Sequence, residues 1–173
     1  MNLEPLIRRI LSEQTTDWHG IHGLSHWGRV YTNGLRVAEE SGANKKVVEL
    51  FAFFHDSKRW NDGADIGHGA RGAEFARSLR GDYFDLSDDE FELLYVACRD
   101  HTEGETEADV TIQTCWDADR LDLGRVWIVP DPERLCTEAA KRPDTIDWAH
   151  KRAEREIIPQ IVAPIWHERR EST

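Results

Sequence analysis

The sequence predicts an all-α protein, a bundle of helices folded as a single domain. Apolar residues recur three and four positions apart along most of the chain, which is the period of one helix face. Gly, Pro, Asn and Ser residues divide the chain into segments of helical length, without an internal repeat. A chain of 173 residues can bury one sizeable core and is short for two. We therefore expect one domain over residues 1–173 with about seven helices.

The first two helices are predicted from apolar spacing and from their end signals. The N-terminal helix, 3–14, gathers its apolar residues on one face. The second begins at Gly23 or Ser25, since Ser and Gly both favour the position before a helix. It ends at Ser41-Gly42, where Gly supplies a stop.

The third helix ends in an unusual pair of residues. Asn44 caps its start, and an apolar run, 47–54, leads directly to His55-Asp56. Such a run belongs in the protein interior, and a bound metal ion is the simplest reason to end it with two good ligands. The structural alternative is a buried imidazole hydrogen-bonded to a carboxylate, which satisfies both groups.

The later helices follow from similar signals. Ser87 and Glu90 have the form of a capping box, so a helix starts there and points towards His101. Pro159 and Pro164 should bend or end whatever follows the last helix, and the segment 130–143 has the weakest signal of all. The remaining predicted helices are a small-residue helix from His68 to Leu79, which permits close helix contact, a helix over 107–123 and a final helix over 146–158.

Composition and charge exclude several classes of protein. The 33 acidic and 22 basic side chains give a net charge of −11, which opposes nonspecific attraction to nucleic acid or to an anionic membrane. Three widely spaced cysteines indicate neither a disulfide framework nor a zinc ribbon. The sequence contains no apolar stretch near the roughly 20 residues of a membrane span. Its first residues, 1–13, carry mixed charge and lack the small-residue cleavage site that a signal peptide would have. We expect a cytoplasmic protein without a polymeric nucleic-acid or membrane partner.

Further ligand-type residues lie before and after the His55-Asp56 pair. His26 precedes it, His68 and His101 follow it, and a cluster that contains Asp117 and Asp119 comes later. Helix-length segments separate these residues, so they converge only if the helices pack around one polar pocket. A mixture of imidazole nitrogen and carboxylate oxygen suits a divalent ion of Mn, Fe, Co, Ni or Zn, or Mg if fewer His take part.

The order of these residues resembles the signature of the HD-domain metal-dependent phosphohydrolase superfamily. That signature is a His, then an adjacent His-Asp pair, then a distant Asp. Here His26, His55-Asp56 and the segment Ala118-Asp119-Arg120-Leu121 match it, within about 23–125. The resemblance implies an HD-type helical bundle and a divalent metal held by His26, His55, Asp56 and Asp119. Asp117 is the rival for the last ligand, and only one of the two should face the metal.

The resemblance also implies roles for residues around the metal. His68 and His101 correspond to ligands of a second metal in some members, or to groups that bind substrate phosphate; we favour one metal, with both lining the pocket. Lys58 and Arg59 follow the pair, and Arg59 can offer phosphate a bidentate fork. Further candidates for phosphate contact, each with an ordinary surface role as the alternative, are Arg29, Arg71 and Arg120.

The chemistry that follows is hydrolysis of a phosphoester. A metal ion lowers the pKa of a bound water, which then attacks phosphorus. Asp56 would hold the metal and orient that water, and Arg59 would offset charge on the phosphate. We therefore predict Asp56 and Arg59 as catalytic residues, Lys58, Arg59, His68 and His101 as substrate contacts, and a nucleotide or another small phosphoester as substrate.

Two other classes of function compete with this one. A di-iron oxygenase on the same scaffold would need His68 and His101 as ligands of a second ion. A noncatalytic nucleotide-binding module would retain the pocket without turnover. The residues leave open the base, the sugar, the physiological metal, release of phosphate or pyrophosphate, and whether the protein is a monomer or a homodimer. We expect His22 to be a neighbour of His26 and not a ligand, and we assign no function to His19, His150 and His167.

Overall fold

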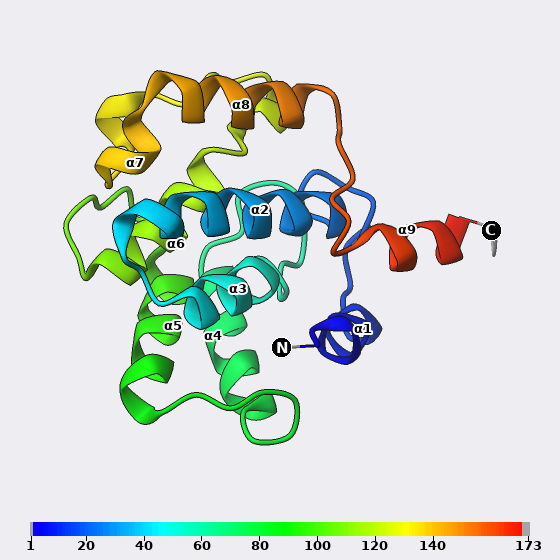
Figure 1. Ribbon diagram of the computed structural model, residues 1–173. Coiled ribbons are helices and arrows are strands. Elements are labelled where there is room, and N and C mark those ends of the chain that lie inside the picture. The colour runs from blue at the N-terminus through cyan, green and yellow to red at the C-terminus, as the bar shows by residue number, and fades with distance from the viewer. Residues whose placement is uncertain (1, 171–173) are drawn as a thin grey trace.

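In the computed structural model, which describes residues 2–170, the chain is all-helical, as predicted (Figure 1). Nine α-helices and two short 3-10 helices make up the regular structure of these residues. The α-helices are α1 (Glu4–Ser12), α2 (Leu24–Ser41), α3 (Lys45–Phe54), α4 (His68–Leu79), α5 (Asp88–Asp100), α6 (Val110–Arg120), α7 (Glu138–Lys141), α8 (Pro143–Glu154) and α9 (Ala163–Arg170). The 3-10 helices are η1 (Leu123–Val126) and η2 (Pro132–Arg134).

The predicted start and stop signals act as expected in α2, α3 and α5. Gly23 precedes α2, and Gly42 follows it in the left-handed conformation, with a φ of 79°. The Asn44 side chain accepts hydrogen bonds from two backbone amides at the start of α3. Ser87 and Glu90 form both hydrogen bonds of a capping box at the start of α5. Local chemistry therefore sets these helix ends.

The predictions were less accurate in the last third of the chain. Helix α6 begins later than expected, because the Asp109 side chain caps it, and it ends at Arg120 before the chain tightens into η1. Pro143 occupies the first turn of α8, where proline is tolerated. Two helices, α7 and α9, were not predicted. Helix α9 contains Pro164 in its first turn, whereas we expected this proline to bend or end the chain after the last helix.

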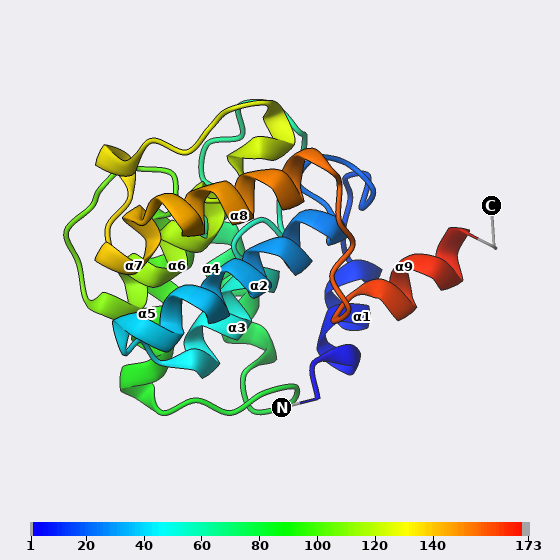
Figure 2. The ribbon, with the colours of Figure 1, turned by 45° about the horizontal axis from the view of Figure 1, so that its top comes forward.

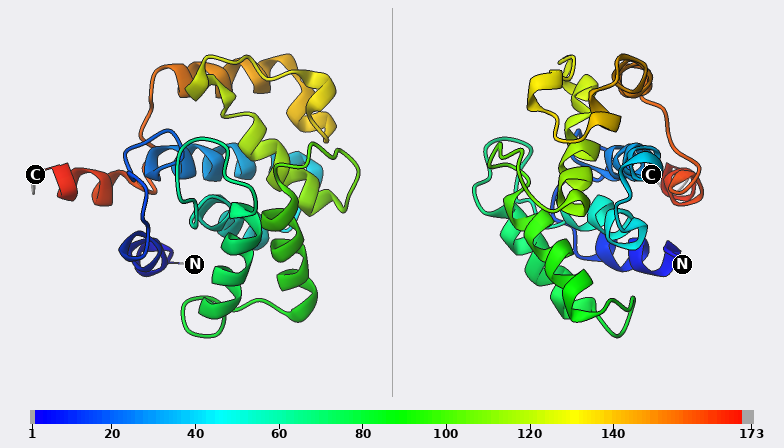
Figure 3. Two further views of the ribbon diagram at one scale, coloured as in Figure 1. Left: turned by 180° about the vertical axis from the view of Figure 1, so that it is seen from behind. Right: turned by 60° about the vertical axis from the view of Figure 1, so that its left-hand side comes forward.

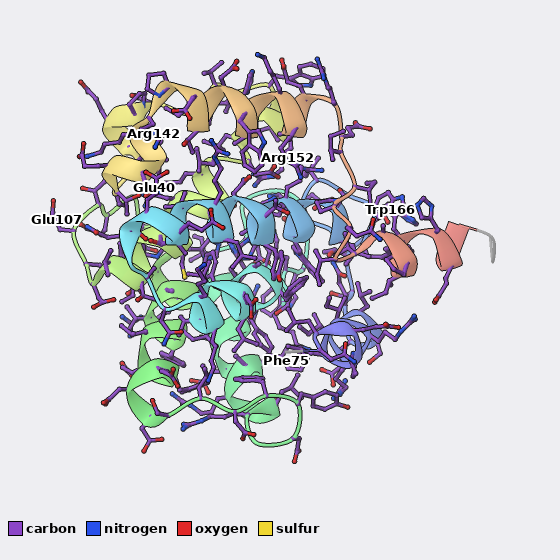
Figure 4. The ribbon with its side chains drawn as sticks, in the orientation of Figure 1. Glu40, Phe75, Glu107, Arg142, Arg152 and Trp166 are labelled. Carbon is purple, nitrogen blue, oxygen red and sulfur yellow. The ribbon has the colours of Figure 1, made fainter. Side chains whose placement is uncertain are left out.

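Helix α2 crosses the middle of the molecule, with α8 and α7 on one side and α3 on the other (Figures 1 and 2). The α4–α5 pair lies beyond α3, and α6 packs against α2, α3 and α5 (Figure 3). Helices α1 and α9 lie at one end, where Arg8 donates a 3.0 Å hydrogen bond to Glu168. At the opposite end, Arg142 reaches back to Glu40 on α2 (Figure 4). No helix within residues 2–170 is long and apolar enough to cross a membrane.

The buried position of α3 places His55 and Asp56 inside the protein. Nearly every residue of its apolar run is buried, including all three phenylalanines of the helix. These side chains form the centre of the main apolar core, and a smaller core lies under α7 and α8. Helix α3 ends at Phe54, so the next two side chains project into a space enclosed by α2, α4, α5 and α6. The sequence pattern predicted this burial.

Two glycines bring α4 close enough to complete that enclosure. A Cβ atom at Gly72 would collide with the backbone carbonyl of Phe54 at the end of α3. A Cβ atom at Gly69 would collide with the carbonyl of Cys98 near the end of α5. Glycine is needed at both positions because there is no room for a side chain, and not because the backbone has an unusual φ angle. The small-residue helix therefore packs as predicted, and it brings His68 to the ends of α3 and α5.

Candidate metal centre

The four predicted ligands meet at one buried point. His26 comes from α2, His55 and Asp56 from the end of α3, and Asp119 from α6. The Nε2 atoms of His26 and His55 are 3.2 Å apart. Asp56 Oδ2 is 3.6 Å from each of them, and Asp119 Oδ1 is 3.4 Å from His26 Nε2 and 3.8 Å from His55 Nε2. Two atoms bound to one ion at about 2.1 Å lie about 3.0 Å apart at right angles and about 3.4 Å apart at a tetrahedral angle. The observed spacing is that of ligands around one ion.

A second cluster lies on the other side of Asp56. Asp56 Oδ1 is 3.0 Å from His68 Nε2 and 3.6 Å from His101 Nε2. The two imidazole nitrogens are 3.0 Å apart. Asp56 therefore faces His26 and His55 with one oxygen and the second pair of histidines with the other. Its carboxylate is the link between the two clusters.

All four histidines are oriented in the same way. Each uses Nδ1 for a hydrogen bond to the protein and turns Nε2 towards Asp56. The Nδ1 partners are Asp122 Oδ2 for His26 at 2.7 Å, Phe51 O for His55 at 3.1 Å, Asp65 O for His68 at 2.6 Å and Cys98 O for His101 at 2.7 Å. An acceptor fixes the proton on Nδ1 and leaves the lone pair of Nε2 for a ligand. This arrangement orients imidazoles for metal coordination.

Burial keeps the first pair of histidines neutral. It lowers the pKa of His55 to about 4 and the pKa of His26 well below its usual value. Burial alone would raise the pKa of Asp119, but His55, Arg125 and His26 lower it overall, so this carboxylate is ionised. Metal ions bind neutral imidazole and ionised carboxylate, so the protonation states match the requirement.

The unsatisfied atoms of the first cluster also fit a cation. Asp119 Oδ1 is buried and accepts no hydrogen bond from the residues that the structure describes. The Nε2 lone pairs of His26 and His55 face each other across 3.2 Å. Buried acceptors without donors are costly, and a divalent ion among them would satisfy all four groups at once. His26, His55, Asp56 and Asp119 are therefore suited to hold a divalent metal.

The second cluster contains a positive group of the protein itself. Arg59 Nη1 is 3.2 Å from Asp56 Oδ1 and 3.0 Å from His68 Nε2. The guanidinium is held there by the loop after α3, since Arg59 also donates to the carbonyls of Asn61 and Gly63. Burial would lower the pKa of His101, but its hydrogen bond to Asp56 and the Asp56 charge raise it overall. This cluster therefore already carries cationic groups around Asp56 Oδ1.

The structure separates the two rival aspartates of α6. Asp117 turns away from the histidines and accepts hydrogen bonds from Cys136 N, Thr137 N and Thr137 Oγ1 at 2.6, 2.8 and 2.7 Å. It anchors the segment that leads into α7. Asp119 is two positions further and points towards His26 and His55. The geometry favours Asp119 over Asp117 as the fourth ligand.

Sequence reasoning missed two residues next to the centre. Asp122 is fully buried and connects His26 Nδ1 to Arg29, whose Nε and Nη2 lie 2.7 and 3.1 Å from its two oxygens. Arg125 places Nη2 3.8 Å from Asp119 Oδ1. Both follow Asp119 closely, in the turn that becomes η1. The only hint in the sequence was that Asp122 is a third acidic residue close to Asp117 and Asp119. The sequence alone does not show that its partners are His26 and Arg29, because these lie far away in the chain.

The prediction for Lys58 needs correction. Its Nζ donates a 2.6 Å hydrogen bond to Glu13 and lies 3.9 Å from the centroid of the Phe75 ring. The side chain therefore does not join the other predicted substrate contacts, which are Arg59, His68 and His101. The chain turns between Lys58 and Arg59, so neighbours in sequence point to different sides.

Several other candidates also have structural partners. Arg71 pairs with Asp65 and lies over the Trp60 ring, and Arg120 donates to the carbonyls of Glu105 and Arg134. His22 is next to His26, with ring centroids 6.3 Å apart, and its Nδ1 lies 3.0 Å from an oxygen of Asp62. These contacts explain the residues without a place at the metal centre.

One of the comparisons with known proteins supports the fold that holds this centre. The chain is similar to a crystal structure described as a predicted HD superfamily hydrolase from an uncultured Thermotogales bacterium. The two share 25% sequence identity with a TM-score of 0.64, and the match covers 96% of this chain and 92% of the other. No family model and no curated protein matches the sequence. The fold and the site together define a class of all-helical proteins with a buried centre of His and Asp residues. Within that class, the chain has the HD-domain fold.

Proposed function

We propose that this protein is a metal-dependent phosphohydrolase that holds one divalent ion with His26, His55, Asp56 and Asp119. The observation that carries the proposal is the convergence of these four side chains from three helices at the spacing of metal ligands. The likeness to a protein described as a predicted HD superfamily hydrolase supports hydrolytic chemistry. The identity of the metal is open among Mn, Fe, Co, Ni, Zn and Mg.

A divalent ion at this point supplies an activated water and neutralises charge on a phosphate group. The residues of the chain provide the surroundings of that chemistry. Asp56 joins the ligand cluster to the groups beyond it, because its two oxygens face opposite sides. On the Oδ1 side, Arg59 offers N–H donors to phosphate oxygens, and His68 and His101 become donors there when their Nε2 atoms carry a proton. Asp56 and Arg59 are therefore the catalytic residues of the proposal.

The proposed substrate is a nucleotide or another small phosphoester. The net charge of −11 repels anions in general. Arg59 and Arg125, on two sides of the ligand cluster, concentrate positive charge where a phosphate would enter. The ligands are buried, and Asp119 is the most exposed of the four with 18% of its side chain accessible. Limited access of this kind favours a small ester over a polymer.

A two-metal centre, including the di-iron oxygenase, is the second candidate. Asp56 Oδ1, His68 and His101 are close enough to hold another ion, and this cluster is the specific observation in its favour. Arg59 Nη1 opposes it, since a guanidinium within 3.2 Å of Asp56 Oδ1 would repel a second cation. We therefore propose that the centre holds one ion, and that the guanidinium of Arg59 provides the positive charge beside Asp56 Oδ1 that a second ion would otherwise supply.

Metal analysis combined with a product-release screen tests the proposal. Purified protein should contain about one divalent ion per chain. With Mn, Co, Ni or Mg it should release phosphate or pyrophosphate from at least one nucleoside mono-, di- or triphosphate. His55→Ala and Asp56→Ala should lose both properties. The control is His167→Ala, because His167 is an exposed histidine on α9. Protein without metal and without turnover of any ester would overturn the proposal.

A further inference from the structure

A cleft of about 630 Å³ opens beside the metal centre. Its walls come from the loop before α2 and the start of α2, from η1 and the residue after it, from the end of α8 and the chain after it, and from α9. The α8 end and the loop before α2 lie on the same side of the molecule (Figures 1 and 2), and Trp166 of α9 is labelled in Figure 4. The side chains that matter most are Ile21, Arg29, Arg125, Trp127, Arg155 and Trp166. The volume is within the range of small-molecule sites, about 300 to 1,000 Å³.

Arg125 belongs to both the cleft and the metal centre. Its side chain lines the cleft, and its Nη2 is 3.8 Å from Asp119 Oδ1. Nη1 donates to the carbonyl of Asp122 at 3.1 Å, which fixes the guanidinium. Its Nε is buried and has no hydrogen-bond partner among residues 2–170. A donor left over at this position is available to an anionic group that lies between the cleft and the centre.

The cleft is also where the backbone is held in a disfavoured conformation. In the described part of the chain, two residues other than glycine have positive φ, Trp127 at 63° and Glu156 at 50°. Both line this cleft, one from each side. Left-handed backbone is costly for residues with a Cβ and is concentrated at functional sites. Trp127 takes this conformation directly after η1, and the residue is 80% exposed at the rim of the cleft.

The chemical character of the walls selects the kind of ligand. Trp127 and Ile21 offer exposed apolar surface, suited to a planar ring. The polar groups are of mixed sign, since Arg125 and Arg155 are accompanied by Glu154 and Glu156. Arg29 is already paired with Asp122. A wall of this kind fits a neutral aromatic ring that carries hydrogen-bonding groups better than it fits a second phosphate.

We propose that this cleft binds the nucleoside part of a nucleotide, with Trp127 stacked on the base and Arg125 in contact with the phosphate. The proposal rests on the proposed function for the position of the phosphate. It narrows the proposed substrate from any small phosphoester to a nucleotide, and it assigns recognition of the nucleoside to residues that line the cleft outside the four metal ligands. Base stacking on an aromatic side chain does not depend strongly on the identity of the base.

The experiment compares Trp127→Gly with wild type. Gly adopts the left-handed conformation of position 127 without strain, so this variant should fold. The control is Trp60→Ala, since Trp60 is likewise 70% exposed but lies over Arg71, outside the cleft. Binding of adenosine, guanosine, cytidine and uridine is followed by calorimetry. Turnover is compared between the corresponding 5′-nucleotides and glycerol 3-phosphate, which has no ring.

We expect Trp127→Gly to weaken nucleoside binding about tenfold or more and to lower kcat/KM for nucleotides by a similar factor. Turnover of glycerol 3-phosphate should change less than about twofold, and Trp60→Ala should resemble wild type in every measurement. Unchanged nucleoside affinity in Trp127→Gly would overturn the inference, as would an equal loss for both substrate classes.

The test separates this inference from the proposed function. Wild-type protein that hydrolyses phosphoesters but binds no nucleoside would overturn the inference and leave the function intact. Protein that binds nucleosides through Trp127 but hydrolyses no ester would support the cleft and overturn the function.

Discussion

Two clusters of the same ligand types lie on opposite sides of Asp56, and they differ first in whether a positive group of the protein is hydrogen-bonded to the ligands. His26, His55 and Asp119 surround a point that contains no positive group of the protein within hydrogen-bonding distance, as far as the described residues show. On the other side, Arg59 donates to Asp56 and to His68. A set of suitably spaced ligands is therefore not sufficient for a metal site. The charge already present decides which side attracts a cation.

The hydrogen bonds behind the histidines strengthen this difference. His26 donates to a buried carboxylate, Asp122, whereas the other three histidines, His55 included, donate to backbone carbonyls. A carboxylate partner raises the basicity of an imidazole ligand more than a neutral carbonyl does. Burial lowers the pKa values of His26 and His55 and keeps both rings neutral and able to bind a cation, whereas the pKa of His101 is raised overall by Asp56 despite its burial. The first cluster is the better metal site on each count.

The largest expected effect comes from removing one histidine on each side. His55→Ala should abolish metal binding, because it removes a ligand that lies within 3.8 Å of all the others. His101→Ala should keep the ion and lose activity through weaker substrate contact. Metal content by mass spectrometry, with a thermal unfolding scan as the check on folding, measures both. Equal metal loss in the two variants would remove the distinction between the clusters.

The two aspartates of α6 provide the next test. Asp119→Asn should weaken metal binding by more than the roughly 10- to 100-fold typical of an outer-shell partner, since a charged ligand is lost. Asp117→Asn should retain the metal and lose about 1–3 kcal/mol of stability, because its carboxylate accepts three hydrogen bonds from Cys136 and Thr137. Isothermal titration with Mn²⁺ and urea unfolding separate the two effects. A metal defect in Asp117→Asn and not in Asp119→Asn would reverse the assignment.

A smaller effect is expected from the carboxylate behind His26. Asp122→Asn should weaken metal affinity about 10- to 100-fold while the four ligands remain in place. The substitution also leaves the buried Arg29 without its ion-pair partner, so some stability should be lost. Arg29→Gln in the same background should recover part of that stability but not the metal affinity. Metal affinity equal to wild type in Asp122→Asn would show that the hydrogen bond from His26 has no influence.

The smallest effect on binding of the first metal ion should come from substitution of Arg59. This substitution tests directly whether charge distinguishes the two clusters. Arg59→Gln removes the positive charge beside Asp56 Oδ1 and leaves His68 and His101 in place. We expect a second, weaker ion to bind, so the metal content rises from about one to about two per chain at high metal concentration. Arg71→Gln is the matched control, because Arg71 pairs with Asp65 outside the cluster. An unchanged content in Arg59→Gln would mean that another feature limits the centre to one ion.

Much of the fold could be predicted, because helix formation depends on nearby residues. The capping box of Ser87 and Glu90, the Asn44 cap and the Gly42 stop lie within a few residues of the helix ends that they define. The segment after Arg120 was harder. Helices α7 and α9 are short, and their positions depend on packing and on the contact between Asp117 and residues 136–137.

The sequence by itself determined the all-helical fold, the burial of α3 and the ligand types that end it. Apolar periodicity, end signals and residue chemistry carry that information locally. Only the tertiary structure decided that Asp119 and not Asp117 faces the histidines, that Arg59 and not Lys58 reaches Asp56, and that Arg125 joins the centre to a cleft. Neighbouring residues point in different directions on a helix or a turn. Which direction is the interior depends on the packing of segments that are far apart in the chain.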